Sequence, residues 1–205
     1  KLKQLGVQRV VLARECTMDE IRACVETGME IEVFIHGAIC ICYSGQCYFS
    51  SVRYDRSGNR GMCAQPCRMP YTLYQDNALV GRELYYLSPK DLSLIDQVKE
   101  LEEMGVVSLK IEGRMKSASY VYESVMQTKS VLDNKFRSKQ DIEDLMVTFN
   151  RGYTKGHAYK MSGYDLMNPQ SCNHQGINIG KVIGKRNGRL VLQLKHEEYY
   201  NSLKE

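Results

Sequence analysis

The sequence has no long hydrophobic run and no marked excess of one charge. No window approaches the roughly 20 consecutive apolar residues of a membrane span, and residues 1–15 lack the apolar region and cleavage site of a secretion signal. With 28 Lys and Arg against 24 Asp and Glu, the net charge of +4 permits a polyanionic partner without indicating one. We therefore expect a soluble, cytoplasmic chain that makes no membrane contact.

Internal repeats, low-complexity tracts and an initiator methionine are also absent from the sequence. The 205 residues are 43% hydrophobic and 25% charged, which is typical of a folded domain and excludes a disordered, collagenous or coiled-coil chain. Because the sequence opens almost directly into a strand-like run, we expect the natural polypeptide to begin upstream of Lys1.

Strand and helix patterns alternate along most of the chain. Apolar, β-branched runs predict strands at residues 8–15, 30–36 and 106–111. Cap residues and apolar stripes predict helices at 17–28, 88–105, 119–132 and 138–150. Strands separated by helices favour parallel pairing, either in an open sheet or in part of a (β/α)8 barrel.

Two segments depart from that alternation. Residues 37–71 have no sustained period, which predicts either a long ordered insertion or a loop organised by a ligand. After about residue 160 the pattern changes to short alternating runs, 178–183 and 189–194, around a turn-prone Asn187-Gly188. We therefore divide the chain into an α/β domain at 1–160, which contains the insertion, and the beginning of a small β-domain at 161–205.

The cysteines gather in the insertion. Five of the eight lie between residues 40 and 67. Thiolates at this density suit an iron–sulfur cluster or a tetrahedral zinc site, because both metals bind soft sulfur ligands. The spacing leaves reduced structural thiols and disulfides or reactive thiols as alternatives, and it does not select four ligands from the five candidates.

Charged residues stand at the predicted strand ends, where parallel α/β folds bind their ligands. They are Arg14, Glu15, His36, Lys110, Glu112 and Arg114. At a period of two, Lys110, Glu112 and Arg114 share one strand face and point together into a barrel or crevice. An internal salt-bridge network is the alternative for Lys110 and Glu112, and a histidine satisfied beside a turn is the alternative for His36.

Arginines and aromatic residues are interleaved in the insertion. The arginines are Arg53, Arg56, Arg60 and Arg68, and the aromatic residues are Tyr48, Phe49, Tyr54 and Tyr71. Such a combination binds single-stranded RNA through phosphate contacts and base stacking. Solvated loop arginines are the alternative.

Four ordered stretches resemble the signature of the U32 peptidase family, also described as collagenase-like proteases. They read EVFIHGAIC with YSGQC at residues 32–47, NRGMCAQPCR at 59–68, SLKIEGRMK at 108–116 and FNRGYTKG at 149–156. The resemblance implies that this α/β chain is the C-terminal half of a TIM-like (β/α)8 barrel with parallel strands, followed by the start of a small β-barrel domain.

The resemblance also implies a chemistry. Better-understood members look like oxygen-independent hydroxylases that act on tRNA or rRNA bases, with prephenate as hydroxyl source, or on ubiquinone. Some carry a 4Fe–4S cluster, whose cysteines match Cys40, Cys47 and Cys63 here. The family's fourth cysteine generally stands where this chain has Ser93. Cys67 is the favoured fourth ligand, and the alternatives are Cys42, weak ligation by Ser93, a non-protein ligand, or loss of the centre.

We therefore expect an enzyme that hydroxylates a pyrimidine in tRNA or rRNA. The expected catalytic residues are His36, Lys110, Glu112 and Arg114, and the expected substrate contacts are Arg14, Glu15, Arg53, Arg60 and Arg68. The unpaired strand edges of a half barrel favour a homo-oligomer or a partner subunit.

Two other functions fit the sequence less well. A collagenase-like protease would use a Cys nucleophile with His36 as its base, and the chain has neither a Gly-x-Ser-x-Gly elbow nor a His-Glu-x-x-His pair. A zinc-stabilised, non-catalytic RNA-binding module is the second alternative.

Overall fold

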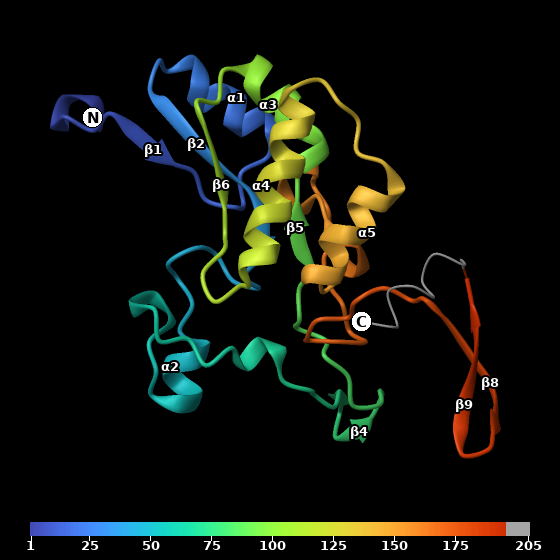
Figure 1. Ribbon diagram of the computed structural model, residues 1–205. Helices are drawn as coiled ribbons and strands as arrows, with labels where there is room; N and C mark the ends of the chain where they lie inside the picture. The colour runs from blue at the N-terminus through green and yellow to red at the C-terminus, as the bar shows by residue number, and fades with distance from the viewer. Residues whose placement is uncertain (196–205) are drawn as a thin grey trace. The chain divides into compact units, whose positions relative to one another are not determined.

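The structure is a computed structural model that describes residues 1–195, in two compact units (Figure 1). The first unit is Lys1–Gln175 and the second begins at Gly176. The first unit continues past the predicted boundary at residue 160, because Leu166 is buried in its core and Asn168 donates a hydrogen bond to Arg151 O at 2.7 Å. The first compact unit thus extends to Gln175, beyond residue 160.

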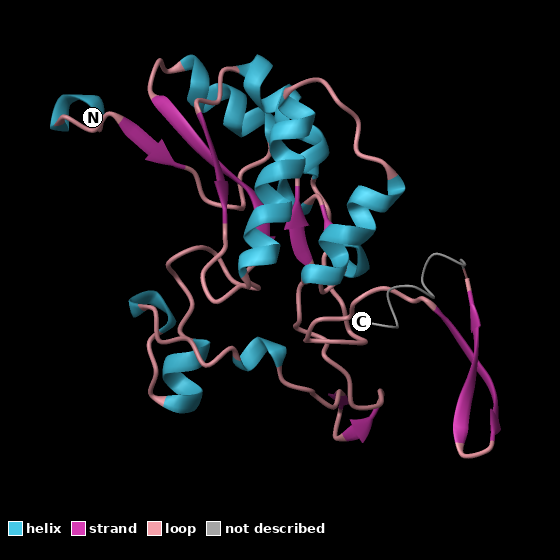
Figure 2. Ribbon diagram, in the orientation of Figure 1, coloured by secondary structure: helices cyan, strands magenta, loops and turns pink. Residues whose placement is uncertain are grey.

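A five-stranded mixed sheet forms the centre of the first unit (Figure 2). Its strands are β1 (Arg9–Val11), β2 (Glu30–Ala38), β5 (Asp91–Ser93), β6 (Ser108–Ile111) and β7 (Tyr153–Thr154). β1 and β6 pair with β2 in parallel, whereas β5 is antiparallel to β2 and parallel to β7. The all-parallel prediction is correct for β1, β2 and β6 and wrong at β5, and the strands described here do not close a barrel.

The segment predicted as one helix at 88–105 is a strand followed by a helix. Asp91–Ser93 is β5, a 3₁₀ turn covers Ile95–Gln97, and α3 spans Val98–Met104. The Leu94 N–H donates to Ile35 O at 2.7 Å, so the sheet satisfies backbone groups that a helix would have used. This strand places Ser93 directly opposite His36.

Two of the other helices begin at the caps that the sequence predicts. α1 (Met18–Glu26) and α5 (Lys139–Thr148) each begin with a capping box, formed by Thr17 with Glu20 and by Ser138 with Asp141. α4 (Ala118–Leu132) begins after Ser117 and packs against α3, α5 and β6. No helix in residues 1–195 has both the length and the apolar character needed to cross a membrane.

The core lies between the sheet and these helices. Ile31, Val33 and Ile35 of β2 are buried with Ile21 of α1 and Leu101 of α3. A second, smaller cluster joins Ile95, Tyr120 and Leu145. The two clusters fix the strand ends on which the candidate site is built.

Residues 37–71, called the cysteine loop below, are ordered as predicted. They contain α2 (Phe49–Tyr54) and 3₁₀ turns at Gly58–Arg60 and Pro66–Arg68. A short hairpin of β3 (Tyr74–Gln75) and β4 (Ala78–Leu79) follows.

The second unit contains one antiparallel hairpin among its described residues, as the sequence predicts. β8 (Gly180–Arg186) and β9 (Arg189–Leu194) are joined at Asn187 and Gly188. Both turn residues have positive φ, 50° and 78°, which is the geometry that an Asn-Gly pair favours in a tight hairpin.

Candidate functional site

The ends of β2 and β6 approach each other unusually closely. The Glu112 N–H donates to His36 O at 2.9 Å. A Cβ on Gly37 would lie 2.6 Å from Glu112 Cβ and 3.0 Å from Glu112 O, and Gly37 has a φ of 121°. Only glycine combines that backbone conformation with so close a contact, so the His36-Gly37 pair and Glu112 are held together at one edge of the sheet.

His36 is buried between two tyrosines at this edge. It is 1% exposed, and its ring centroid lies 5.5 Å from that of Tyr120 and 5.3 Å from that of Tyr153. Within residues 1–195, neither ring nitrogen has a hydrogen-bond partner, and the same holds for Ser93 Oγ. Burial lowers the pKa of His36 to about 4, so the imidazole is neutral at pH 7.

A bulge separates His36 from the polar face of β2. The alternation along residues 30–36 predicts that His36 shares a face with Glu32 and Phe34. The β2–β6 register shifts between Phe34 and His36, and Ile35 and His36 are consequently both buried. The predicted alternation is therefore correct as far as Phe34 and wrong at His36.

Ion pairs involve three of the six predicted strand-end residues, namely Arg14, Lys110 and Glu112. Lys110 Nζ lies 2.7 Å from Glu32 Oε1, and Arg14 Nη2 lies 3.1 Å from Glu112 Oε2. The hydrogen bond from Lys110 is the main cause that lowers the pKa of Glu32. Arg114 is exposed. Lys110 and Glu112 thus form two separate, partly exposed salt bridges, and the catalytic roles expected of Lys110, Glu112 and Arg114 stay predictions.

Two predicted substrate contacts instead fasten the cysteine loop. Glu15 Oε1 accepts hydrogen bonds from Ser44 N–H at 2.8 Å and from Ser44 Oγ at 3.1 Å. Arg68 is buried, and its Nη1 donates to Ser88 Oγ and to Pro89 O, both at 2.7 Å. Burial lowers the pKa of Arg68 to about 10. The guanidinium of Arg68 therefore supports the loop, and its expected contact with an RNA phosphate stays a prediction.

The predicted metal ligands lie in one electrostatic neighbourhood. All eight cysteines are free thiols. Burial is the main cause that raises the pKa of Cys40 and of Cys67, and Cys47 and Cys63 raise both further. No three His, Cys, Asp or Glu side chains in residues 1–195 are grouped closely enough to hold a metal ion. The thiols are thus soft donors of the kind that iron–sulfur clusters and zinc take, but their described positions do not form a ligand set.

A buried ion pair at the same edge was not predicted. Arg151 donates from Nε to Asp91 Oδ1 at 3.0 Å and from its backbone N–H to Asp91 Oδ2 at 3.1 Å. Asp91 is 3% and Arg151 6% exposed. Arg151 lies in the stretch FNRGYTKG, so the family resemblance marks one partner of this ion pair. Asp91 lies in the segment that the sequence predicts as a helix, so no sequence pattern marks the other partner.

Lys116 adds a further cation near Asp91. Its Nζ lies 2.8 Å from the Phe149 ring centroid. The pKa of Lys116 is lowered to about 8, chiefly by burial, with Arg151 and Arg68 lowering it further and Asp91 opposing them. We call Arg68, Lys116 and Arg151 around Asp91 the basic cluster. These three cations outnumber the two carboxylates, Asp91 and Glu112, that raise the pKa of Lys116, which leaves an excess of one positive charge and favours an anionic ligand.

The basic cluster and His36 belong to one electrostatic site. Asp91 raises and Lys116 lowers the pKa of His36, although burial has the larger effect. Lys116 also comes from a stretch quoted above, SLKIEGRMK. It lies beyond the end of β6, where the two-residue period of a strand no longer applies, so the sequence pattern does not single it out.

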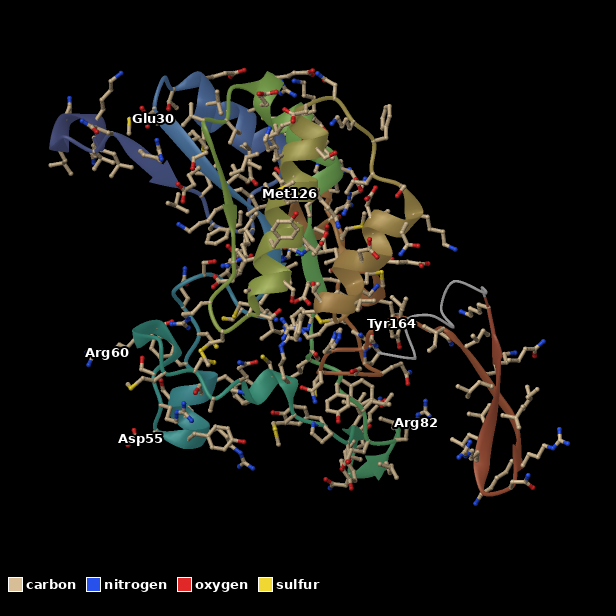
Figure 3. The ribbon with its side chains drawn as sticks, in the orientation of Figure 1. Glu30, Asp55, Arg60, Arg82, Met126 and Tyr164 are labelled. Carbon is tan, nitrogen blue, oxygen red and sulfur yellow. The ribbon has the colours of Figure 1, made fainter. Side chains whose placement is uncertain are left out.

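Exposed aromatic and basic side chains cover the outer part of the cysteine loop. Tyr43 and Tyr48 are 69% and 68% exposed, and Arg53 is also exposed. Arg60 projects outward from the same loop (Figure 3). Two of the three predicted loop contacts, Arg53 and Arg60, are thus open to a ligand.

Known proteins resemble most of this chain. Residues 1–168 match the family model described as Peptidase family U32. The chain is 43% identical over 178 residues to the tRNA hydroxylation protein P1 of Bacillus subtilis, an alignment that covers 80% of this chain and 42% of that protein. It is 39% identical over 197 residues to a 23S rRNA 5-hydroxycytidine synthase of Escherichia coli, covering 89% of this chain and 30% of that protein.

A relative that is named as a collagenase, and not for RNA hydroxylation, is similar over the same region. The collagenase of Porphyromonas gingivalis is 34% identical over 200 residues, covering 85% of this chain and 48% of that protein. The chain thus spans less than half the length of these curated relatives. No solved structure matches it.

Proposed function

The chain belongs to peptidase family U32, and on that premise we propose that it is part of an enzyme that hydroxylates a pyrimidine base in tRNA or rRNA without molecular oxygen. Two relatives are named for hydroxylation of tRNA and of rRNA, and both cover at least 80% of this chain. The basic cluster is the observation that carries the proposal, because its excess positive charge beside a thiol-rich loop suits an anionic co-substrate.

We propose prephenate as the hydroxyl donor. Prephenate carries two carboxylates, which lysine and arginine bind through charge-assisted hydrogen bonds. Arg151 is committed to Asp91 and Arg68 to Ser88 and Pro89, so Lys116 is the member of the cluster that would meet the donor first. The neutral imidazole of His36 would accept or hold a proton at the same edge.

The thiols of the cysteine loop would hold the cofactor, for which we propose a 4Fe–4S cluster. Cys40, Cys47 and Cys63 are the proposed ligands, with Cys67 as the fourth. Burial disfavours the free thiolates of Cys40 and Cys67, and a bound cation would reverse that effect. When bound, the cluster would supply redox-active iron beside the thiols that hold it. A tetrahedral zinc ion is the alternative for the same thiols.

The remaining parts of the proposal concern the RNA and the whole protein. Arg53 and Arg60 would contact RNA phosphates, and the exposed tyrosines beside them would stack on unpaired bases. The mixed sheet would form part of a (β/α)8 barrel in the whole protein, which we place in the cytoplasm with its RNA substrate.

Nucleoside mass spectrometry of tRNA and rRNA tests the proposed function. The gene is deleted and complemented with the full-length protein, with Lys116→Met, or with Lys129→Met. Lys129 is an exposed lysine paired with Asp133 and serves as the control. We expect one hydroxylated pyrimidine to disappear on deletion and to return with the wild type and Lys129→Met, but not with Lys116→Met.

Other outcomes would support the alternatives. An unchanged nucleoside profile after deletion contradicts RNA hydroxylation. Gelatin cleavage that survives iron removal and is stopped by thiol alkylation would favour the protease. Bound zinc with salt-dependent RNA affinity and no modified base would favour the non-catalytic module.

A further inference from the structure

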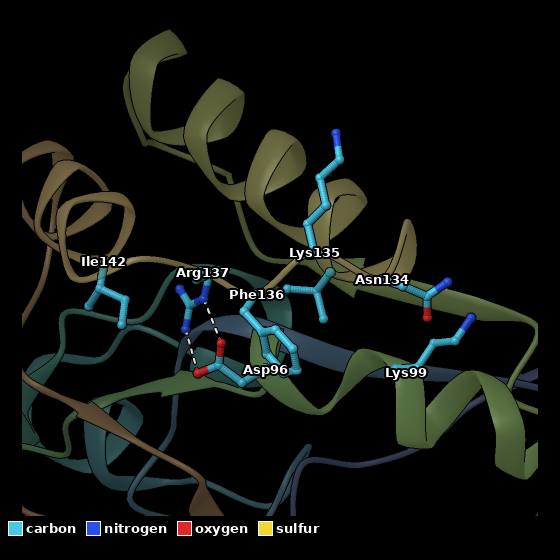
Figure 4. Close-up of a pocket in the computed structure, with 8 residues that line it drawn as sticks. Asp96, Lys99, Asn134, Lys135, Phe136, Arg137 and Ile142 are labelled. Atoms are coloured by element: carbon cyan, nitrogen blue, oxygen red, sulfur yellow. Dashed lines mark hydrogen bonds and ion pairs between the residues drawn. The ribbon is translucent and has the colours of Figure 1, made fainter.

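A cavity of about 460 Å³ lies beside the linker between α4 and α5, where that linker faces the start of α3 (Figure 4). Val131, Phe136 and Ile142 form its apolar lining, and Lys99, Asn134 and Lys135 contribute polar groups. None of its lining residues belongs to the candidate site described above. The volume and the mostly apolar lining are typical of sites for small molecules.

A rigid ion pair forms another part of the lining. The side chain of Arg137 is 5% exposed, and its Nε and Nη2 each lie 2.7 Å from one carboxylate oxygen of Asp96. Its Nη1 donates to Gln127 Oε1 at 3.1 Å. This bidentate pair fixes the linker and compensates the charge of Asp96, so the cavity is preformed and this part of its lining has no net charge.

Lys135 is the lysine of the lining that forms no salt bridge among the described residues, whereas Lys99 Nζ is 2.6 Å from Glu102 Oε2. The charge of Lys135 acts on Asp133, but the closest partner of that carboxylate is Lys129, at 3.0 Å. The neighbouring Phe136 is fully exposed, which is rare for a large aromatic side chain. An apolar cavity thus has an exposed lysine outside any salt bridge and an uncovered aromatic ring in its lining.

We propose that this cavity binds a small anionic molecule with a flat apolar body, independently of the RNA-modifying site. The apolar body would pack on Val131, Ile142 and Phe136, and the anionic group would pair with Lys135. A neutral molecule of the same shape would gain the apolar contacts without the ion pair, so it would bind more weakly.

Two matched probes test this site in the full chain. The anion 1-naphthoate and the neutral alcohol 1-naphthalenemethanol have the same ring system and similar size. The methyl NMR signals of Val131 and Ile142 report occupancy. We expect naphthoate to shift both signals in a saturable manner, as binding to one site requires. Its affinity should fall with added salt and should be about tenfold higher than that of the alcohol.

Variants of two neighbouring lysines separate the cavity from general charge. Lys135→Gln is expected to weaken naphthoate binding about fivefold and to leave the alcohol unaffected. Lys139→Gln is the control, because Lys139 is exposed, lies outside the lining and pairs with Glu143 at 3.5 Å. The proposal is overturned if naphthoate leaves the Val131 and Ile142 signals unshifted, or if the two lysine variants weaken binding equally.

A cavity-filling variant provides a second test. Ile142→Trp is expected to abolish binding of both probes while α5 stays helical by circular dichroism. Binding that persists in a folded Ile142→Trp protein places the probe elsewhere and contradicts the proposal. If the variant does not fold, the comparison of Lys135→Gln with Lys139→Gln decides the matter by itself.

Discussion

Arg151 holds the carboxylate of Asp91 with its side chain and its backbone at once: Nε lies 3.0 Å from Oδ1 and the backbone N–H 3.1 Å from Oδ2. Asp91 begins β5, and its register partner is Tyr153 at the start of β7. The ion pair therefore joins two strands at the edge where His36 and Lys116 lie, and it fixes the position of the basic cluster.

Removing the charge of Asp91 tests how much this ion pair contributes to the stability of the fold. We expect Asp91→Asn to lower the free energy of unfolding by about 3–5 kcal/mol, because Arg151 would stay buried without its counter-charge. Urea denaturation of the full chain measures the change. Asp133→Asn removes only an exposed pair with Lys129 and should leave the midpoint almost unchanged. Equal midpoints for the two variants would count against a buried pair.

The close approach of Gly37 to Glu112 predicts a strong effect of one added methyl group. Gly37→Ala places a Cβ 2.6 Å from Glu112 Cβ on a residue with a φ of 121°. We expect a loss of about 2–4 kcal/mol in the free energy of unfolding, from overpacking combined with backbone strain. Gly184→Ala, where a Cβ meets nothing within 4 Å, is the control and should change stability little. A stable Gly37→Ala protein would show that β6 can move away.

Lys116 should titrate far below an ordinary lysine. Burial, Arg151 and Arg68 lower its pKa to about 8, whereas the hydrogen bond to Glu102 raises the pKa of Lys99. Amine acylation followed by peptide mass spectrometry, repeated across pH, should therefore modify Lys116 at lower pH than Lys99. Coincident pH profiles for the two lysines would refute the proposed environment of Lys116.

The lowered pKa of Lys116 also predicts how the stability of the fold changes with pH. The folded-state pKa of Lys116 lies below its unfolded value, so the unfolded chain binds the proton more tightly. Raising the pH from about 8 to about 10.4 therefore relieves a destabilising effect of Lys116. Lys116→Met should lack this relief.

His36 predicts an acid-dependent loss of stability. Its folded-state pKa of about 4 lies below the ordinary value of 6.5, so the unfolded chain takes up the proton first as the pH falls. The stability present above pH 6.5 should be lost progressively down to about pH 4, by about 3 kcal/mol. His36→Phe keeps the aromatic contacts and should flatten this dependence. His157→Gln, which leaves His36 in place, should retain it.

Cysteine variants should separate the proposed metal ligands from the other thiols. After anaerobic purification of the full-length protein, we expect Cys40→Ala, Cys47→Ala and Cys63→Ala each to lose most of the bound iron and sulfide. Cys24→Ala removes a thiol of α1 and should leave the metal content unchanged. Zinc in place of iron would support the zinc alternative, and wild-type protein without either metal would remove the cofactor from the proposal.

Local signals predicted the helix starts and the hairpin, and long-range pairing explains the error at β5. The caps at Thr17 and Ser138 depend on side chains three residues away, so the sequence displays them directly. Ser88 and Pro89 imitate a helix start, but Asp91–Ser93 pairs with β2 and β7, whose residues lie more than 50 positions away. No local pattern reveals that pairing.

Tertiary contacts also explain what the sequence does not show about the site. Arg68 has the pattern of a solvated loop arginine, and only its hydrogen bonds to Ser88 and Pro89 show that it supports the loop. Arg151 and Lys116 lie inside the stretches quoted above, but the carboxylate that pairs with Arg151 and raises the pKa of Lys116 belongs to Asp91, which the pairing of β5 with β7 brings to the same edge.

Ala38 and Asp91 are cross-strand partners, so the polypeptide between them forms a ring closed by the sheet. For a flexible ring the closure entropy grows only with the logarithm of its length, and doubling the length adds about 0.6 kcal/mol. Evolution can therefore lengthen or shorten this ring at little thermodynamic expense. Insertions and deletions among U32 proteins should concentrate inside it, while the spacing of the residues on either side of the closure stays constant.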